Sequence, residues 1–170
     1  MHLVSIIMPT FNSSSTVADS IKSVLEQSYS NWELLITDDC STDDTLGIIQ
    51  SFSDRDSRIK VFQNTENGGA GISRNNSISM AKGRFIAFLD SDDMWFKDKL
   101  FEQINFMLEN DYALTYTNYI KVDENNNVIG TVWPGKSDVY HAFQSTWIPY
   151  GTPYISIASD VKQYMEVCHQ

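Results

Sequence analysis

The sequence is poor in basic residues. Its 170 residues include 12 Lys and Arg against 22 Asp and Glu, which gives a net charge of −10 at pH 7. This balance argues against nucleic-acid binding, because too few cations are available for a stripe of phosphate contacts. If such an acidic protein binds a phosphate ligand, something positive must lie between the two, and a metal ion is the simplest candidate.

Cysteine and long apolar segments are also scarce. The two cysteines, Cys40 and Cys168, lie far apart and match no metal-ligand spacing, so we expect reduced thiols. No stretch approaches the roughly 20 apolar residues that are needed to span a bilayer. The N-terminus lacks the basic flank and apolar run of a signal peptide. These absences favour a cytoplasmic protein.

The remaining composition is that of an ordinary globular domain, with 42% hydrophobic and 20% charged residues. We expect one domain over residues 1–170, in which strands and helices alternate. Apolar runs predict strands at 3–8, 32–37, 58–62 and 84–89, and apolar periodicity predicts helices starting near 14 and 41, over 70–82 and around 100–108. This order predicts an α/β fold with a mostly parallel, Rossmann-like sheet flanked by helices.

Proline, glycine and short polar residues mark the expected ends of these elements. The markers are Pro9 at the end of the first strand, Ser14 or Ser15 at the start of the first helix, Ser41 with Asp44 as a capping box for the second helix, and Gly83 at the end of the third. Residues 123–127 are expected to form a hairpin turn between extended segments at 112–122 and 128–132.

Three predicted strands lead directly into distinctive motifs, at residues 9–12, 38–39 and 90–93. In open parallel sheets, ligands bind beyond the carboxyl ends of the strands, at the point where the strand order reverses. We therefore expect the three motifs to converge on one binding site.

The acidic cluster Asp90-Ser91-Asp92-Asp93 has the chemistry of a divalent-metal site. Mg²⁺ and Mn²⁺ prefer oxygen ligands, and Mg²⁺ usually takes one or two protein carboxylates together with substrate phosphates. An ion that bridges a diphosphate acts as a Lewis acid and template for departure of a nucleoside diphosphate. The alternative is that the cluster caps a helix near residues 95–97, and the cluster alone does not decide between the two.

Asp38-Asp39 and Arg74 also have structural alternatives. An aspartate after an apolar strand can accept hydrogen bonds from a nucleobase or ribose, or it can be a dipole partner for the helix near Ser41. Arg74, on the first turns of the third helix, can pair with a phosphate or a clustered aspartate, or it can lie on a solvated face.

Taken together, these motifs resemble the family-two glycosyltransferases over about residues 3–110. The matching segments occur in the family's order and are Val4–Asn12, Ser23–Tyr29 with Trp32–Asp43, Asn67–Asn75 and Gly83–Asp93. The resemblance implies the GT-A fold, also called the nucleotide-diphospho-sugar transferase fold. It also implies sugar transfer from a nucleotide-diphosphate donor, usually a UDP-sugar, with Mn²⁺ or Mg²⁺ and inversion at the anomeric carbon.

The resemblance implies roles for residues at the nucleobase. Pro9, Phe11 and Asp39 would line its pocket, with Asp39 hydrogen-bonded to the base. Arg74 would lie near the base and the phosphates. Many relatives have Tyr where this chain has Phe11, so stacking on the ring is kept and a phenol hydrogen bond is lost.

The metal motif of the family, Asp-x-Asp, matches Asp90-Ser91-Asp92. The resemblance makes Asp92 the direct metal ligand and places Asp90 nearer the ribose or the metal-bound waters. Residues 1–110 would then form the nucleotide-sugar and metal-binding half of the domain, and residues 111–170 a partial acceptor-side region.

The resemblance fails at the general base. Family members carry this carboxylate well beyond the metal motif, often in a Glu-Asp pair, and the sequence contains no such pair. After Asp138 only Asp160 and Glu166 remain, in unexpected surroundings, so no catalytic residue is assigned. We expect a fragment, truncated at its C-terminus, or a short version of the domain. Its aromatic tail over 133–154 is expected to serve a core or an interface, with a stacking platform for an acceptor sugar as the alternative.

Three functions are weighed: a metal-dependent glycosyltransferase, a non-catalytic nucleotide-sugar binding module, and a sugar-phosphate nucleotidyltransferase. The last needs a Gly-rich, basic loop after the first strand to hold a triphosphate, whereas residues 9–13 contain no Gly, Lys or Arg. The metal-dependent glycosyltransferase is the favoured function.

The expected partners of such an enzyme are a nucleotide-sugar donor and a glycan or lipid-linked acceptor, without nucleic acid. Peripheral contact with the inner face of a membrane, and a homodimer, are compatible with it.

Overall fold

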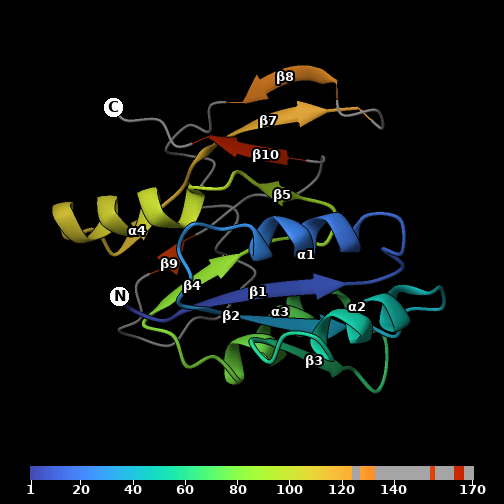
Figure 1. Cartoon of the computed structure of the whole chain (residues 1–170). Helices are drawn as coiled ribbons and strands as arrows, with labels where there is room; N and C mark the ends of the chain where they lie inside the picture. The colour runs from blue at the N-terminus through green and yellow to red at the C-terminus, as the bar shows by residue number, and fades with distance from the viewer. Residues whose placement is uncertain (124–126, 133–153, 156–162, 167–170) are drawn as a thin grey trace.

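The computed structural model describes residues 1–123, 127–132, 154–155 and 163–166, and strands alternate with helices from the N-terminus (Figure 1). The helices are α1 (Val17–Leu25), α2 (Thr45–Ser53), α3 (Gly69–Ser79) and α4 (Lys99–Asn110). The strands are β1 (Val4–Thr10), β2 (Trp32–Asp38), β3 (Ile59–Gln63), β4 (Phe85–Phe88), β5 (Met94–Trp95), β6 (Leu114–Thr115), β7 (Asn118–Val122), β8 (Val128–Val132), β9 (Tyr154–Ile155) and β10 (Gln163–Glu166).

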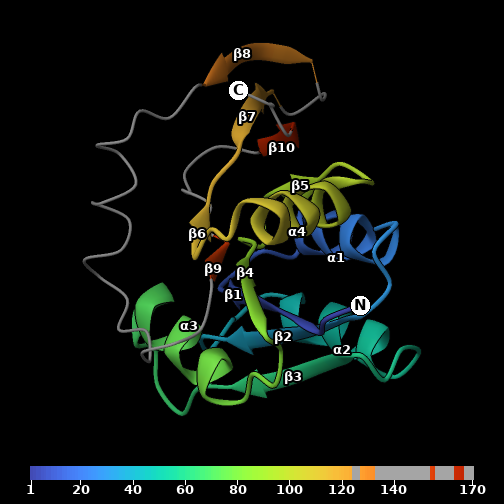
Figure 2. The same ribbon diagram turned by 90° about the vertical axis from the view of Figure 1, so that its left-hand side faces the viewer.

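The main sheet is parallel and confirms the predicted fold class. Its strands lie in the order β3-β2-β1-β4-β9-β6, and each neighbouring pair is parallel. The chain builds outward from β1 to β3 and then crosses back to place β4 on the other side of β1. The strand order therefore reverses between β1 and β4. Helices α1, α2 and α4 lie on one side of the sheet and α3 lies on the other (Figure 2).

Strand β1 is buried along its whole length because helices cover both faces of the sheet. Its side chains alternate between two cores. Ile6 packs in the larger core with residues of α1, α2 and α4, whereas Ile7 packs on the α3 side with Leu35 and Phe88. This two-sided burial explains the continuous apolar run of the sequence.

Helix α3 is attached to the sheet mainly through polar groups. Its buried residues are Ser73 and Ser77. The Ser77 hydroxyl lies 2.6 Å from the Thr37 hydroxyl and donates to the Leu35 carbonyl at 3.2 Å. Ile72 remains 52% exposed. The position of this helix consequently depends on hydrogen bonds more than on apolar packing.

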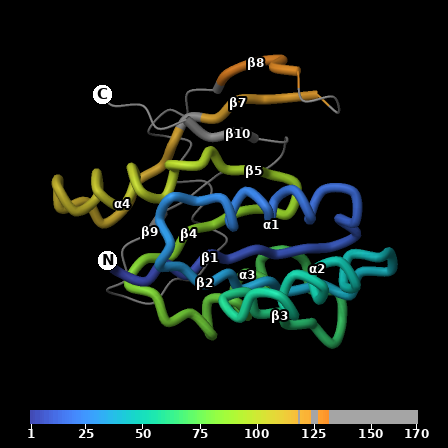
Figure 3. The backbone as a smooth tube through the Cα atoms, viewed as in Figure 1, coloured from blue at the N-terminus to red at the C-terminus, as the bar shows by residue number. Residues whose placement is uncertain are grey.

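A second sheet has the order β5-β10-β7-β8. Strands β7 and β8 form the predicted antiparallel hairpin, and the Asp123 amide donates to the Asn127 carbonyl at its turn. The short strand β5, which sequence reasoning does not predict, follows the acidic cluster and connects β4 to this second sheet (Figure 3). The helices within the described ranges are too short or too polar to cross a membrane.

Strand β1 continues past its predicted end, through Pro9 to Thr10. The Thr10 carbonyl accepts the Asp39 amide on the β2 side, so the backbone of Pro9 faces the β4 side. Pairing with β4 has already ended there, because its last register pair joins Ile7 to Phe88. The missing N–H of Pro9 therefore costs no hydrogen bond of the sheet.

The predicted starts of the first two helices are wrong. Thr16, rather than Ser14 or Ser15, is the N-cap of α1. Helix α2 begins at Thr45, beyond the predicted capping box at Ser41, because the Ser41 side chain has a different partner in the preceding loop.

The predicted role of Gly83 is also wrong. Helix α3 ends at Ser79, before this glycine. A Cβ atom on Gly83 would lie 2.5 Å from the Ser5 nitrogen and 2.8 Å from the carbonyl oxygens of Leu3 and Phe85. Glycine is therefore required because the chain passes against the backbone of β1 as it enters β4.

Candidate functional site

A pocket of about 480 Å³ lies at the carboxyl end of β1, where the strand order reverses. It opens because β1 continues to Thr10 while the chain leaves the sheet after β4. All seven predicted binding residues lie in its lining, and they are Pro9, Phe11, Asp39, Arg74, Asp90, Ser91 and Asp92. The structure thus brings the three strand-end motifs together, as the sequence predicts.

Asp39 is a buried carboxylate, 3% exposed, that anchors the start of α3. Its Oδ1 accepts hydrogen bonds from Asn64 Nδ2 at 2.6 Å and the Gly68 amide at 2.9 Å, and its Oδ2 accepts the Gly69 amide at 2.7 Å. Gly69 has a φ of 84°, which explains the glycine. Burial raises the pKa of Asp39, but the hydrogen bonds led by Gly68 and Asn64 outweigh it and hold the pKa below its usual value.

Asp39 therefore does interact with a helix N-terminus, as the alternative for Asp38-Asp39 supposes, but the helix is not the one that follows Ser41. Asp39 serves the N-terminus of α3 rather than the helix after Ser41. Among the bonds found within the described part of the chain, Oδ2 accepts one backbone hydrogen bond. A carboxylate oxygen can accept two, so Oδ2 has capacity for a donor from a ligand in the pocket.

Asp38 and the residues after it form a scaffold for the loop that follows β1. Asp38 accepts the hydroxyl of Ser41 at 2.5 Å and its amide at 3.0 Å. The Ser41 hydroxyl in turn accepts the Asn12 amide at 2.9 Å, and Asn12 Oδ1 accepts the Thr42 amide at 2.8 Å. Asn12 is held at a φ of 49° by these contacts. They fix the backbone beside Phe11.

Asp43 holds the same loop from the other side. It accepts the Ser14 amide at 3.1 Å and the hydroxyl and amide of Thr45, at 2.5 and 3.0 Å. The hydrogen bond from the Thr45 side chain is the main reason why the pKa of Asp43 lies far below its usual value. The N-cap of α2 is Asp44 rather than the predicted Ser41, and Asp43, just before it, ties the first residue of α2 to the loop between β1 and α1.

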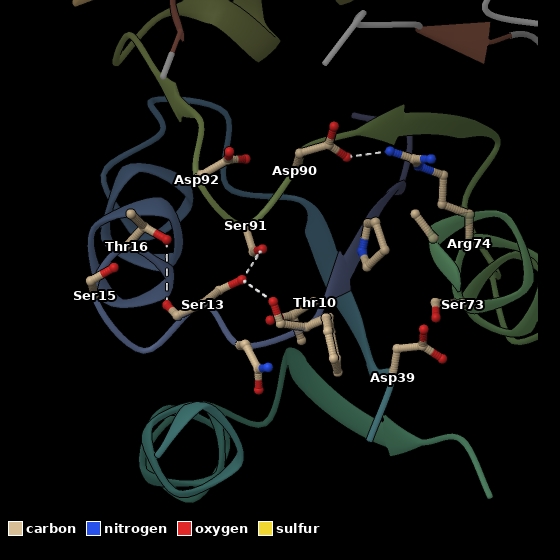
Figure 4. A pocket seen from close by; sticks show the side chains of 14 residues that line it. Thr10, Ser13, Ser15, Thr16, Asp39, Ser73, Arg74, Asp90, Ser91 and Asp92 are labelled. Atoms are coloured by element: carbon tan, nitrogen blue, oxygen red, sulfur yellow. Dashed lines mark hydrogen bonds and ion pairs between the residues drawn. The ribbon is translucent and has the colours of Figure 1, made fainter. Parts of the chain in front are cut away.

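Arg74 crosses the pocket from α3 to the acidic cluster (Figure 4). Its Nη2 lies 2.5 Å from Asp90 Oδ1, and the two side chains are 22% and 15% exposed. The prediction that Arg74 pairs with a clustered aspartate is confirmed, and the solvated-face alternative is wrong. Among the described residues of the pocket lining, Arg74 is the one cation.

Ser91 and Asp92 complete the acidic side of the pocket. The Ser91 hydroxyl lies 2.8 Å from the Ser13 hydroxyl, and the Ser91 carbonyl accepts the Ser20 hydroxyl at 2.9 Å. These bonds fix the loop against α1. Asp92 is exposed at the pocket, on the other side of Ser91 from Asp90 (Figure 4).

The alternative that the acidic cluster caps a helix is wrong. Residues 94–95 form β5, and α4 begins at Lys99 with Asp98 as its N-cap. The cluster therefore lies at a strand end facing a pocket rather than at a helix N-terminus.

The donor set of the pocket fits an oxygen-preferring divalent ion that is shared with a ligand. The described residues contain no cluster of three or more His, Cys, Asp and Glu side chains able to enclose a metal. Asp92 and Asp90 provide two carboxylates on one loop, and Mg²⁺ or Mn²⁺ commonly takes one or two carboxylates with phosphate oxygens and water. Such a set suits an ion that binds together with a diphosphate.

Sequence reasoning misses the hydroxyl-rich wall of the pocket. Ser13, Ser15 and Thr16 line it from the loop between β1 and α1, and Ser73 lines it from α3. The available signal is the polar run at residues 12–16, directly after β1.

Sequence reasoning also misses Asn64, although a signal for it is available. It directly follows β3, as the three recognised motifs follow β1, β2 and β4, and its side chain contacts Asp39. Cys40 has a φ of 63°, and its thiol donates to the Asn64 carbonyl at 3.2 Å.

The remaining candidates of the sequence lie outside the described residues. They are Asp138, Asp160, the aromatic residues of 133–153, and Cys168, while the side chains of Tyr154 and Glu166, in β9 and β10, are not described.

Comparison with known families agrees with this geometry. The model of Glycosyl transferase family 2 matches residues 5–159. The Escherichia coli protein named UDP-Glc:alpha-D-GlcNAc-diphosphoundecaprenol beta-1,3-glucosyltransferase WfgD is 50% identical over 129 residues, which cover 76% of this chain and 50% of that protein. The similarly named WfaP of Escherichia coli is 45% identical over 119 residues, or 70% of this chain and 47% of that protein.

Among solved structures, that of Staphylococcus aureus TarS residues 1–349 in complex with UDP has a TM-score of 0.65 and 32% sequence identity. The match covers 75% of this chain and 38% of that one. The chain spans about half the length of WfgD and WfaP.

Proposed function

The chain belongs to glycosyl transferase family 2, and on this basis we propose that it binds the nucleotide-diphosphate sugar of a glycosyltransferase reaction. The observation that carries the proposal is the convergence of Asp39, Arg74 and Asp92 on one pocket at the switch point of a parallel sheet. The base, the phosphates and the metal ion would occupy successive parts of this pocket.

The nucleobase would bind between Pro9, Phe11 and Asp39. Phe11 is 48% exposed although it is aromatic, so its ring is available for stacking at the pocket edge. The remaining acceptor capacity of Asp39 Oδ2 suits an N–H donor, such as the imide of uracil. UDP is the proposed nucleotide, supported by the UDP complex of TarS and by the name of WfgD.

The diphosphate would bind between Arg74 and the acidic cluster. Arg74 is paired with Asp90, and the described lining of the pocket carries three aspartates against this one cation. An anionic diphosphate would therefore be repelled unless a cation joined it. We assign Asp92 as the direct ligand of Mn²⁺ or Mg²⁺ and Asp90 to the ribose or the metal-bound waters, with Ser91 holding the loop. When bound, the ion neutralises charge on the leaving nucleoside diphosphate.

The two halves of the chain would have separate tasks. Residues 1–110 would bind the donor and metal, and residues 111–170 would contribute to the acceptor side. We propose transfer with inversion to a glycan or lipid-linked acceptor, supported by the diphosphoundecaprenol substrate in the name of WfgD. A lipid-linked acceptor would bring the chain to a membrane surface.

A second candidate function is a module that binds nucleotide sugar without turning it over. Donor hydrolysis or transfer separates the two, because a binding module would turn over no donor.

Calorimetric titration with UDP, with and without Mn²⁺, tests the donor site. The wild-type chain should bind UDP at least about tenfold more tightly with Mn²⁺, which corresponds to about 1.4 kcal/mol. Asp92→Ala should lose this gain because it removes the proposed direct ligand.

Asp98→Ala is the matched control, since Asp98 is an exposed aspartate that lies six residues after Asp92 and does not line the pocket. It should retain the metal-dependent gain. UDP binding that is absent from the wild type, or that ignores Mn²⁺, would refute the proposed donor site.

A further inference from the structure

Asn64 lies at the carboxyl end of β3, behind Asp39 rather than in the lining of the pocket. Its Nδ2 donates to Asp39 Oδ1 at 2.6 Å and to the Ser73 hydroxyl at 3.0 Å, and its Oδ1 accepts Asn76 Nδ2 at 2.6 Å. Its backbone amide also donates to the Asp38 carbonyl. One amide side chain therefore joins the end of β2 to two successive turns of α3.

These contacts carry unusual weight because α3 has little apolar anchorage. Its buried residues are Ser73 and Ser77, and Ile78 packs against the smaller apolar core, while hydrogen bonds join the helix to Asp39, Asn64 and Thr37. A helix with so small an apolar face depends strongly on such bonds for its position. Loss of the bonds made by Asn64 would thus loosen the attachment of Ser73 and Asn76 to the end of β2, while the bonds from the Gly68 and Gly69 amides to Asp39 remain.

Arg74 directly follows Ser73, so the segment that Asn64 holds is the segment that carries the cation of the pocket. Hydrogen bonds join Asn64 to Asp39 and to Ser73, and the next residue of α3, Arg74, pairs with Asp90. Asp39 lies at the proposed nucleobase subsite, and the Arg74–Asp90 pair lies at the proposed diphosphate subsite.

We propose that Asn64 is a positioning residue that fixes α3 relative to Asp39, so that Arg74 is held where the diphosphate of the donor binds. This inference rests on the proposed function for the identity of the ligand. Its structural part, the fixing of α3, concerns the ligand-free chain. Asn64 itself touches no ligand in this arrangement and acts through Arg74.

The test compares Asn64→Ala with Asn75→Ala, which removes the same type of side chain from an exposed position on α3. Mn²⁺-pyrophosphate serves as a probe that has phosphates and no base. Asn64→Ala should weaken the binding of Mn²⁺-pyrophosphate about tenfold, the effect of losing one charge-assisted hydrogen bond between Arg74 and a phosphate. Asn75→Ala should leave this binding unchanged. Asn64→Asp should weaken it further, because a second carboxylate would face Asp39.

A double-mutant cycle separates positioning from a general structural role. If Asn64 acts through Arg74, Asn64→Ala should have no further effect on pyrophosphate binding in an Arg74→Ala background. The proposal would be overturned if the losses of pyrophosphate affinity caused by Asn64→Ala and Arg74→Ala multiplied in full in the double variant. It would also be overturned if Asn64→Ala bound pyrophosphate as the wild type does.

Hydrogen exchange keeps this proposal distinguishable from the donor-site proposal. Without ligand, the amides of residues 69–74 should exchange about tenfold faster in Asn64→Ala than in the wild type or Asn75→Ala. Unchanged exchange would overturn the positioning role even if the wild type binds UDP. If the wild type binds no UDP, faster exchange in Asn64→Ala alone would still support the fixing of α3.

Discussion

Substitution of Glu33 tests how strongly one buried carboxylate fixes the strand that leads to the acidic cluster. Glu33 lies on β2 and is 5% exposed. Its Oε1 accepts the Ser5 hydroxyl at 2.7 Å and the Lys82 amide at 2.8 Å, and its Oε2 accepts Lys60 Nζ at 2.7 Å. Glu33 thereby joins β1, β3 and the segment before β4.

The expected magnitudes follow from the burial of each contact. The two bonds to Oε1 involve a largely buried charge and contribute about 1.5–3 kcal/mol each. Lys60 is 40% exposed, so its ion pair contributes about 1 kcal/mol or less. Glu33→Ala should therefore lower the free energy of unfolding by about 3–5 kcal/mol. Glu33→Gln keeps an acceptor for Ser5 and Lys82 and should lose about 1 kcal/mol.

The effect should depend on pH. Burial raises the pKa of Glu33, but hydrogen bonds from Lys60, Ser5 and Lys82 outweigh it and lower the pKa overall. A carboxylate whose pKa falls on folding stabilises the protein above its unfolded pKa of about 4.3. That stabilisation is lost as the pH falls through the folded value. The difference in unfolding free energy between wild type and Glu33→Gln should consequently shrink from about pH 6 to about pH 3.

Urea unfolding followed by circular dichroism measures these differences at both pH values. Glu66→Gln is the control, because Glu66 is an exposed glutamate in the loop before α3. It should change the unfolding free energy little at either pH. A loss below about 1 kcal/mol for Glu33→Ala, or a Glu33→Gln difference that does not change with pH, would refute the reasoning.

Two further predictions concern the entry to β4 and the edge of the pocket. Gly83→Ala should destabilise the fold by about 2 kcal/mol or more, because its Cβ would meet backbone atoms of Leu3, Ser5 and Phe85, and an unchanged melting temperature would contradict this. Phe11→Ala should weaken UDP binding in calorimetry by about 1–3 kcal/mol through loss of stacking, whereas Phe11→Tyr should retain it. Equal UDP affinity for the wild type and Phe11→Ala would exclude a stacking role for this ring.

The parallel core could be predicted because its signals are local. The apolar runs around Ile6, Leu35 and Phe88 are strands that are buried on both faces, and each run is continuous in the sequence. The convergence of Asp39 and Asp92 was predictable for a related reason. The carboxyl ends of parallel strands meet at one edge of a sheet, so residues that directly follow such strands share a site.

Contacts between residues distant in sequence were not predictable. Ser41 has the pattern of a helix cap, but its hydroxyl is used by Asp38 and Asn12, so the helix begins later. Gly83 has the pattern of a helix end, but its requirement comes from Ser5, 78 residues earlier in the chain. The roles of such residues depend on partners that only the folded chain brings near.

The acidic cluster also forms the joint between the two sheets. β4 belongs to the parallel sheet and β5 to the mixed one, and residues 89–93 are the direct covalent connection between them. A shift of either sheet relative to the other would pass through the backbone that carries Asp90 and Asp92. A ligand that bound the second sheet and shifted this backbone would change the affinity of the pocket, and by thermodynamic reciprocity a ligand in the pocket would change the affinity for that other ligand to the same degree.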